Sequence, residues 1–285
     1  MTPPTPPTPA RPVAVAVSGR GLVDPALPVL RADDEGFARG TAVFETLRVY
    51  GGVPFRLTEH VARLRLSAER LELIPPNPEH VGELARVALD AARLGDGVLR
   101  LYWTPGAAGD EPRGIALVAP LPAGLEAQRL RGLRVVTLAW PRRDVAWLLP
   151  STKSVSYATH LAAQREAARR GADDAVFVDP DGVVLECPVS NIWWREGKRL
   201  LTPSLELGIL AGETRAALLE LATGLGYAIE QGAFSLESLA GADEAFTTSS
   251  VREVMPVVRL DGRTIPRGPA AEELQAALRQ LATSR

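Results

Sequence analysis

The chain has 285 residues, of which 46% are hydrophobic and 23% charged, as in an ordinary globular protein that is long enough for two domains. The formal net charge of −2 excludes a strong electrostatic attraction to nucleic acid or to an anionic membrane surface, and no apolar run approaches the ~20 residues of a transmembrane helix. Cys187 is the single cysteine, which excludes a disulfide framework, so we expect a cytoplasmic protein.

The first 118 residues predict a tail followed by an α+β domain. Residues 1–12, MTPPTPPTPARP, lack the basic start and the apolar stretch of a secretory signal, and we expect them to be disordered. A strand is expected at 13–17, and VFETLRVYGGVPFRL predicts a β-hairpin that turns at Gly51 and Gly52. Helical spacing of apolar residues predicts helices in EHVARLRLSAERL and HVGELARVALDAARL, while GVLRLYWTPG and GIALVAP predict strands. Together these elements form an N-terminal domain at 13–118.

The rest of the chain predicts a linker and a second domain. Residues 119–132, rich in Pro and Gly, are the expected interdomain linker, and residues 133–285 are the expected C-terminal domain. Strands are expected in LRVVTLAW, DAVFVD, VVLECPV, SNIWWREGKRLLTP and AFTTSS. Helices are expected in THLAAQREAARRG, from Glu213 to about Gly224, and in AAEELQAALRQLA.

The lysines carry the first chemical signal. Only two of the 32 basic residues are lysines, Lys153 and Lys198. A primary amine that loses its proton and attacks a carbonyl group cannot be replaced by arginine, whose guanidinium stays protonated. Lys198 lies in the polar turn REGKR, where we expect a solvated side chain. Lys153 precedes a helical pattern, so it is either a reactive amine or an ordinary lysine at a helix start.

Four further features each have a ligand-binding interpretation and an ordinary structural one. Gly212 leads into a helix at Glu213 and Thr214, and such a helix start either binds phosphate through its free N–H groups or is an ordinary cap. The hydroxyl groups at the end of AFTTSS either complete a phosphate site or form a polar strand end. Glu186 interrupts an apolar run and needs a partner, which is either a protonated ring nitrogen or an arginine. Arg63 is either a phosphate ligand or a solvated helix charge.

In order and spacing, five segments resemble the class IV aminotransferases, the fold-type IV enzymes that use pyridoxal 5′-phosphate (PLP): RGTAVFETLRVYGG, HVARLRLSA, KSVSYATHLAAQREAARRGADDAVFVDPDGVVLECPVSN, LTPSLELGILAGETR and TSSVREVMPV. The family includes branched-chain and D-amino-acid aminotransferases and 4-amino-4-deoxychorismate lyases. The resemblance implies a D-amino-acid aminotransferase-like fold that mixes α+β and α/β structure. Its N-terminal α/β domain is small, and its larger C-terminal domain has a mixed, barrel-like sheet with helices. The resemblance also implies a homodimer in which a loop of the partner subunit closes the site. We expect no metal site.

The resemblance assigns cofactor-binding roles residue by residue. Lys153 matches the Schiff-base lysine, Glu186 the carboxylate that keeps the pyridine nitrogen protonated, and Tyr157 a tyrosine that hydrogen-bonds the phenolic oxygen of the cofactor. The resemblance implies that the Glu213 side chain points outward, so that the Glu213 backbone amide can bind the phosphate group. The residues that match phosphate-binding positions come from three segments: Arg63, the helix start at Gly212, Glu213 and Thr214, and the turn at Ser249 and Ser250.

The candidate substrate-binding residues match different subfamilies of the family. Arg39 stands where many members have a tyrosine and, with the segment WLLPSTKSVSYA, resembles the deoxychorismate lyases. Arg100 matches an arginine of the branched-chain enzymes, whereas Pro105 replaces the carboxylate-binding arginine of the D-amino-acid enzymes. The favoured reaction is transfer of the amino group of a branched-chain or other hydrophobic amino acid to 2-oxoglutarate. The alternative is 4-amino-4-deoxychorismate lyase, which releases pyruvate and 4-aminobenzoate.

Overall fold

The structure is a computed structural model that describes residues 10–140 and 151–284. Most of the predicted disordered tail lies outside the described residues, as do residues 147–150 of WLLPSTKSVSYA.

The contacts within the chain divide it into two compact units. The first contains Pro9–Pro122 and Thr152–Tyr157, and the second contains Ala123–Ser151 and Ala158–Arg285. The lysine segment therefore packs with the N-terminal residues, although the sequence analysis assigned all of residues 133–285 to the C-terminal domain.

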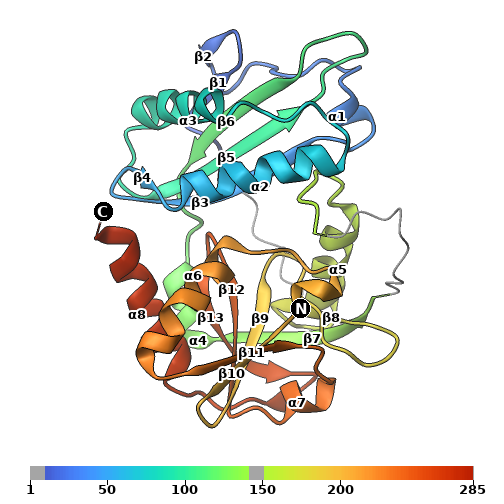
Figure 1. The fold of residues 1–285 in the computed structure, drawn as a ribbon, viewed down its shortest axis with the longest axis vertical. Coiled ribbons are helices and arrows are strands. Elements are labelled where there is room, and N and C mark those ends of the chain that lie inside the picture. The colour runs from blue at the N-terminus through green and yellow to red at the C-terminus, as the bar shows by residue number, and fades with distance from the viewer. Residues whose placement is uncertain (1–9, 141–150, 285) are drawn as a thin grey trace. The chain divides into compact units, whose positions relative to one another are not determined.

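The first unit is built on a six-stranded sheet whose strands are β1 (Ala14–Val17), β2 (Gly21–Val23), β3 (Val43–Tyr50), β4 (Val53–Pro54), β5 (Gly97–Thr104) and β6 (Arg113–Ala119). All neighbours are antiparallel, in the order β2-β1-β6-β5-β3-β4 (Figure 1). The predicted hairpin is confirmed as β3 and β4. Its turn residues Gly51 and Gly52 have φ angles of 54° and 86°, which glycine adopts without steric strain.

Helices α2 (Leu57–Arg70) and α3 (Pro78–Ala92) cover one face of this sheet, and a short helix α1 (Glu35–Ala38) precedes β3 (Figure 1). The helix predicted in HVGELARVALDAARL is confirmed as α3, but it begins two residues earlier, because the Asn77 side chain caps it by accepting hydrogen bonds from the amides of Glu79 and His80 at 2.8 and 3.3 Å. The core under the helices includes Val61, Leu64 and Ala68 of α2, Val81, Leu84 and Ala88 of α3, and Val43, Leu47, Leu99 and Leu101 of the sheet.

Alternation along β3 determines which side chains can reach the site. Val43 and Leu47 are buried beneath the helices, whereas Phe44 and Thr46 are half-buried and project from the opposite face, because successive side chains of a strand point to opposite sides. Glu45 therefore lies on the helix-covered face.

The second unit has a mixed sheet whose strands are β7 (Leu133–Ala139), β8 (Asp174–Val178), β9 (Asn191–Glu196), β10 (Arg199–Pro203), β11 (Ala228–Gly232), β12 (Glu244–Ser249), β13 (Glu253–Leu260) and β14 (Arg263–Thr264). Their order is β11-β10-β9-β12-β13-β7-β8, with β14 paired to β13 (Figure 1). The pairs β10–β11, β13–β7 and β7–β8 are parallel, and the other pairs are antiparallel.

Residues 183–187 connect the two edges of this sheet. The Phe177 amide of β8 donates to the Glu186 carbonyl oxygen at 2.8 Å, and the Val184 amide donates to the Phe234 carbonyl oxygen, just after β11, at 2.9 Å. The sheet therefore curves in the barrel-like manner that was predicted. The prediction of a regular strand in VVLECPV is wrong, because this segment changes partners within a few residues and forms only isolated bridges.

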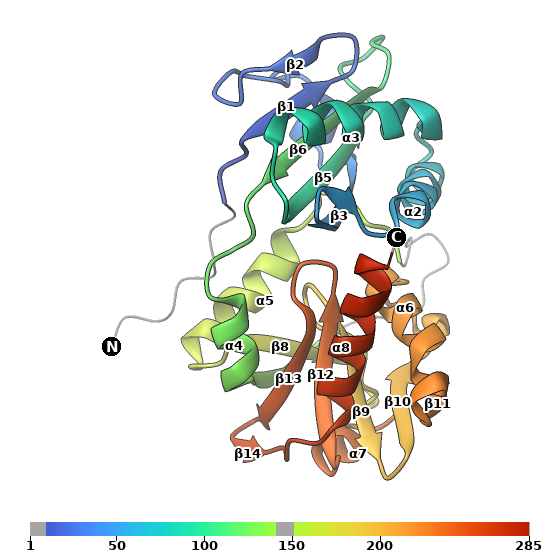
Figure 2. The same cartoon turned by 90° about the vertical axis from the view of Figure 1, so that its left-hand side faces the viewer.

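The helices of the second unit are α4 (Leu125–Arg131), α5 (Ala158–Arg169), α6 (Glu213–Ala222), α7 (Leu236–Ala240) and α8 (Ala270–Thr283), with short 3-10 helices at Leu205–Leu207 and Thr223–Leu225. α6 and α8 lie side by side against β12 and β13 (Figure 2). α4 falls inside the predicted linker, so that segment is not irregular throughout. Its flanking residues Gly124 and Gly132 have φ angles of 80° and 79° and delimit the helix. Among the described residues, no helix combines the length and apolar character needed to cross a membrane.

Candidate active site

The backbone of Lys153 is fixed between β3 and α2. Its carbonyl oxygen accepts a hydrogen bond from the Phe44 amide (3.0 Å), and its amide donates to the Ser67 hydroxyl oxygen of α2 (3.2 Å). Next along the chain, Ser154 forms an antiparallel bridge with Val43. The lysine is thus held both by strand pairing and by a buried helix residue that precedes it by 86 positions.

Aromatic rings lie beside the amine. The Lys153 Nζ atom is 4.4 Å from the centroid of the Phe44 ring, a cation–π distance. Phe44 contacts Tyr157 edge-on at 5.6 Å and stacks on Tyr102 at 5.9 Å between ring centroids. A primary amine therefore lies next to flat, largely apolar surface, an arrangement that suits a planar ring system.

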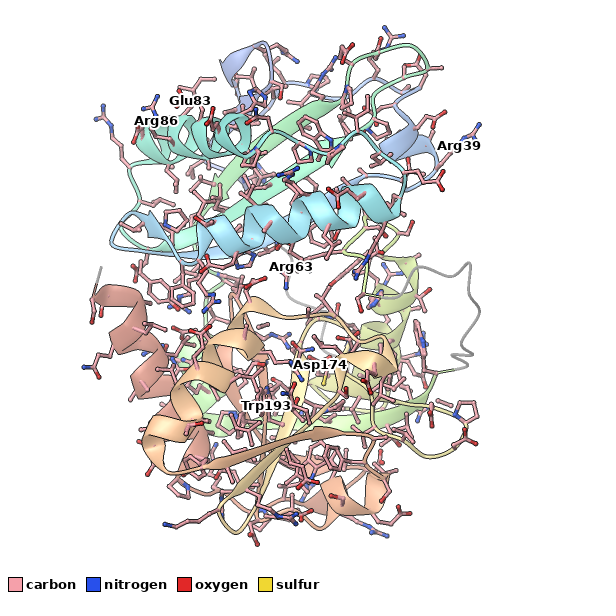
Figure 3. All side chains as sticks on the ribbon, in the orientation of Figure 1. Arg39, Arg63, Glu83, Arg86, Asp174 and Trp193 are labelled. Carbon is pink, nitrogen blue, oxygen red and sulfur yellow. The ribbon has the colours of Figure 1, made fainter. Side chains whose placement is uncertain are left out.

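Arg63 of α2 (Figure 3) is buried, and it is paired with Glu45 of β3. Arg63 Nε and Nη2 donate to Glu45 Oε1 and Oε2 at 2.7 and 2.6 Å, and His60 Nδ1 lies 2.7 Å from Oε2. Burial alone would raise the Glu45 pKa, but the charge and hydrogen bonds of Arg63, with those of His60, hold it at about 2. Glu45 is therefore an ionised carboxylate inside the first unit, and it fixes the Arg63 guanidinium.

The Glu186 carboxylate is half-buried, and a backbone amide and a side-chain amide contact it. Both of its oxygens lie 3.1 Å from the Leu210 amide, and Asn191 Nδ2 lies 3.4 Å from Oε2. These two contacts orient the carboxylate.

Asn191 connects Glu186 to the start of α6. Gly212 is the residue that caps α6, and the cap has no side-chain hydrogen bond. A Cβ atom on Gly212 would overlap Asn191 Oδ1, while Asn191 Nδ2 donates to the Leu210 carbonyl oxygen at 2.9 Å. The glycine therefore permits a close approach of Asn191 to the helix start, which offers backbone N–H groups to an anion.

The turn between β12 and β13 lies beside the same asparagine. Thr248 is paired with Asn191 across β9 and β12, and Ser249 is paired with Glu253 at the other side of the turn. Ser249 and Ser250 are half-buried. Glu186, the start of α6 and this turn thus share one neighbour.

The sequence model of the family described as amino-transferase class IV matches residues 42–260 of this chain. The chain belongs to the class IV aminotransferases. It is 35% identical over 267 residues to a bifunctional aminodeoxychorismate lyase / D-amino acid transaminase of Mycobacterium tuberculosis, across 88% of this chain and 92% of that protein. Other relatives carry the names putative branched-chain-amino-acid aminotransferase, in Methanocaldococcus jannaschii, and D-alanine aminotransferase, in Bacillus licheniformis.

Solved structures confirm the predicted fold of this class IV aminotransferase. A fold IV transaminase from Curtobacterium pusillum is 40% identical, covers 91% of either chain and has a TM-score of 0.86. A hypothetical aminotransferase from M. tuberculosis in its PLP-bound form is 34% identical, with a TM-score of 0.90 over 95% of this chain and 99% of that chain. The two-domain fold-type IV architecture follows, and the protein is a PLP-dependent aminotransferase or aminodeoxychorismate lyase acting on amino and keto acids.

The described residues of this class IV aminotransferase fit PLP chemically. The first unit provides the amine of Lys153 beside aromatic rings and the oriented guanidinium of Arg63. The second unit, taken by itself, contains the Glu186 carboxylate and a helix start at Gly212 that has no side-chain capping hydrogen bond. These are the groups that a carbonyl carbon, a phosphate dianion and a protonated ring nitrogen require. In residues 10–140 and 151–284, no group of three or more His, Cys, Asp or Glu side chains is arranged for a metal ion.

The two candidate substrate residues of the aminotransferase differ in their surroundings. Arg100 is half-buried on β5, where it is paired with Thr46 and shares a face of the strand with Tyr102. Arg39 follows α1 and is exposed, and its side chain extends away from the helix into solvent (Figure 3). Arg100 therefore lies on the face of β5 that carries Tyr102, whereas Arg39 is exposed to solvent.

Three residues that the sequence analysis did not single out contact the candidate site residues. Glu45 holds Arg63, Asn191 holds Glu186, and Ser67 holds Lys153. Glu45 had a detectable signal, because a carboxylate stood at a core-facing position of the apolar run VFETLRVY. Ser67 and Asn191 lacked a comparable signal, since polar residues of this kind are common in helices and strand ends.

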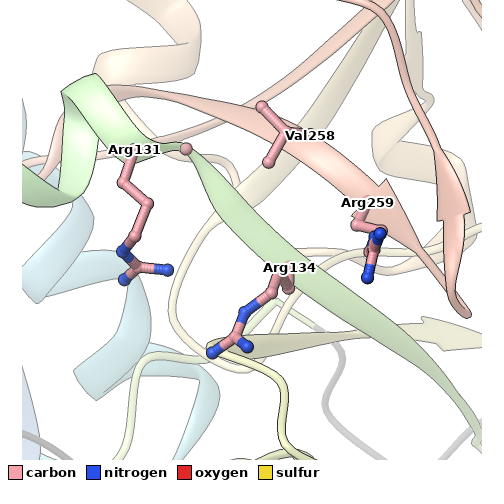
Figure 4. A pocket seen from close by; sticks show the side chains of 5 residues that line it. Arg131, Arg134, Val258 and Arg259 are labelled. Atoms are coloured by element: carbon pink, nitrogen blue, oxygen red, sulfur yellow. The ribbon is translucent and has the colours of Figure 1, made fainter.

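A separate hollow of about 350 Å³ lies on the second unit and is lined by Arg131, Gly132, Arg134, Val258 and Arg259 (Figure 4). Arg131 and Arg134 both pair with Asp173, at 2.9 and 3.2 Å. Val258 and Arg259 lie near the end of β13 opposite to the turn at Ser249. The hollow is therefore a charged surface depression and not part of the candidate site.

Proposed function

We propose that Lys153 is the catalytic amine of this enzyme, that Glu186 faces the ring nitrogen of PLP and that Tyr157 donates a hydrogen bond to its phenolic oxygen. The hydrogen-bonded setting of Lys153 and Glu186 supports these roles. We further propose that the phosphate group binds Arg63, the backbone at Gly212, Glu213 and Thr214, and the turn residues Ser249 and Ser250.

Bound PLP supplies an electron sink that makes a proton on the substrate Cα removable. In this proposal Lys153 carries that proton, which a guanidinium could not do because it does not give up its own proton near neutral pH. Glu186 holds a proton on the ring nitrogen by presenting a negative charge to it. The Leu210 amide and Asn191 keep the carboxylate in one orientation, so no reorganisation is needed during the reaction.

The proposed reaction is transamination from a branched-chain or other hydrophobic amino acid to 2-oxoglutarate. One observation carries this choice: Arg100 and Tyr102 share a face of β5, and Tyr102 stacks on Phe44, the ring that contacts the Lys153 amine. A guanidinium beside aromatic surface fits a substrate with a carboxylate at one end and an apolar side chain at the other.

The test is a panel of amino acids incubated with the PLP-loaded enzyme, with and without 2-oxoglutarate. We expect glutamate to form with leucine, isoleucine or valine, and only when 2-oxoglutarate is present. Activity confined to small D-amino acids, or absence of glutamate with every donor, would refute the proposed substrate class.

The second candidate reaction is the lyase reaction of 4-amino-4-deoxychorismate. It is favoured by the relative with 35% identity, whose name includes aminodeoxychorismate lyase, and by the exposed Arg39, which could meet an additional carboxylate. Release of pyruvate and 4-aminobenzoate without any 2-oxo acid acceptor would support the lyase, because elimination needs no second substrate.

We also propose that the enzyme is a cytoplasmic homodimer in which a partner loop closes the site. The family resemblance supports the dimer, and the single buried cysteine suits a reducing compartment. Analytical ultracentrifugation of the PLP-loaded enzyme tests the dimer. A mass of one chain at micromolar concentration would refute it.

A further inference from the structure

Three ionisable side chains converge in the core of the first unit. Glu45, His60 and Arg63 are 0%, 1% and 8% exposed, respectively. Glu45 comes from β3, and the other two come from successive turns of α2, so their side chains share one face of the helix. Charged groups are rarely buried this deeply unless they are paired and hydrogen-bonded.

The pairing is side-on and bidentate. Glu45 binds the Nε and Nη2 donors of Arg63 at 2.7 and 2.6 Å, which uses two of the five N–H donors of the guanidinium. Because the guanidinium is planar, two bonds along one edge fix the directions of the remaining N–H groups. His60 Nδ1, 2.7 Å from Oε2, in turn restricts the rotation of the carboxylate.

The arrangement is costly as a purely stabilising device. Apolar side chains of similar volume often stabilise a core as well as a buried ion pair does, because the pair must be removed from water. An arginine side chain that binds a ligand also loses considerable rotamer freedom unless it is already fixed. Glu45 fixes it before the ligand arrives.

We infer that Glu45, itself held by His60, is a positioning residue that orients Arg63 for the phosphate group of the cofactor. The inference rests on the proposed phosphate role of Arg63. In this inference the Glu45 carboxylate acts only through the Arg63 guanidinium. The carboxylate sets the direction of the Arg63 N–H groups and does not itself contact the cofactor.

The experiment compares two ligands of the apoenzyme, PLP and pyridoxal, which lacks the phosphate group. Both can react with Lys153, so the ratio of their dissociation constants, Kd for pyridoxal over Kd for PLP, measures the contribution of the phosphate. We expect Arg63→Ala to lower this ratio about ten- to hundredfold and Glu45→Gln to lower it about tenfold. Since Glu45 acts through Arg63, the double variant should lower it no further than Arg63→Ala alone.

The matched control is Glu244→Gln. Glu244 is also a buried carboxylate, 2% exposed and 3.2 Å from Arg195, but it lies at the opposite end of β12 from Ser249. Its replacement should lower the melting temperature and leave the ratio of the two dissociation constants unchanged. If Glu45→Gln cannot be purified in folded form, Glu45→Asp keeps the charge but shifts it by one methylene group, and the same fall in the ratio is expected.

Two results would overturn the inference. An unchanged ratio in a folded Glu45 variant would show that the carboxylate only stabilises the fold. A double variant whose loss equals the product of the single losses would show that Glu45 acts independently of Arg63. Failure of the proposed function looks different: the wild-type apoenzyme would then bind neither PLP nor pyridoxal at Lys153.

Discussion

Adding one methyl group at Gly212 should disturb the neighbourhood of Glu186 as well as the start of α6. The Gly212 backbone has φ −70° and ψ 134°, which any residue can adopt, so the effect of Gly212→Ala is steric rather than conformational. The new Cβ would overlap Asn191 Oδ1, so Asn191 must move. Its amide then loses the hydrogen bond to the Leu210 carbonyl oxygen and the longer contact with Glu186.

The expected cost follows from these contacts. Asn191 is 3% exposed, and leaving a buried amide without its partners costs about 1–3 kcal/mol. Two smaller effects on the free energy of unfolding oppose each other. Alanine lowers the entropy of the unfolded chain, which stabilises the protein by about 0.4–1 kcal/mol, and it caps a helix less well than glycine, which destabilises the protein by a similar amount. A net loss of about 2 kcal/mol should lower the melting temperature by about 4–8 °C.

Thermal unfolding of the apoenzyme measures this loss, and Gly224→Ala is the control. Gly224 lies in the 3-10 helix after α6, and nothing lies within 4 Å of the position its Cβ would take, so its replacement should change the stability by no more than about 0.5 kcal/mol. In an Asn191→Ala background, Gly212→Ala should cost little, because the overlapping oxygen is gone. Equal losses in both backgrounds would refute the steric explanation.

Further predictions concern the chemistry and the pH dependence. The PLP-loaded protein should be yellow, and borohydride should attach the cofactor covalently to Lys153; peptide mapping that finds the label on Lys198 would contradict the assignment. Glu186→Gln should leave PLP bound but lower kcat at least about tenfold, or about 1.4 kcal/mol, in steady-state assays, and an unchanged kcat would make Glu186 structural only. If Arg39 reads the distal carboxylate of a dicarboxylate, Arg39→Lys should raise KM for 2-oxoglutarate and leave KM for the hydrophobic donor unchanged; identical KM values for every substrate would remove Arg39 from the site. The Glu45 pKa lies below its unfolded value of 4.5, so its contribution to stability is complete above that pH and is lost as the pH falls toward 2. Denaturant titrations between pH 6 and 3 should therefore show a smaller pH dependence for Glu45→Gln than for the wild type.

The elements with a strong local signal were predictable. The hairpin of β3 and β4 follows from two glycines between β-rich runs, and α3 follows from the helical spacing of apolar residues in HVGELARVALDAARL. α4 was missed, because Pro and Gly around Leu125–Arg131 suggested an irregular linker, whereas the glycines only delimit a short helix. Pro and Gly residues indicate where a helix can end, but they do not exclude a short helix between them.

The contacts that organise the site were not predictable from local patterns. Glu45 and Arg63 meet because β3 packs beneath α2, and Asn191 reaches Gly212 because β9 ends beside the start of α6. Such pairs depend on how separate elements pack against each other. The periodicity of residues along one element does not predict this packing. The family resemblance proposes roles for residues such as Arg63 and Glu186, but it does not indicate the residues that contact them.

The attachment of Lys153 to the N-terminal sheet has a consequence for biosynthesis. Every strand of that sheet has been synthesised by Ala119, whereas Lys153 and the bridge between its neighbour Ser154 and Val43 require the chain as far as Ser154. If the sheet forms first, the loop that must close to place the lysine shortens from 86 residues to about 30, which reduces the entropic cost of closure by about 1 kcal/mol. A first unit that folds as it leaves the ribosome would thus add the Lys153 segment last, after the sheet to which that segment binds is complete.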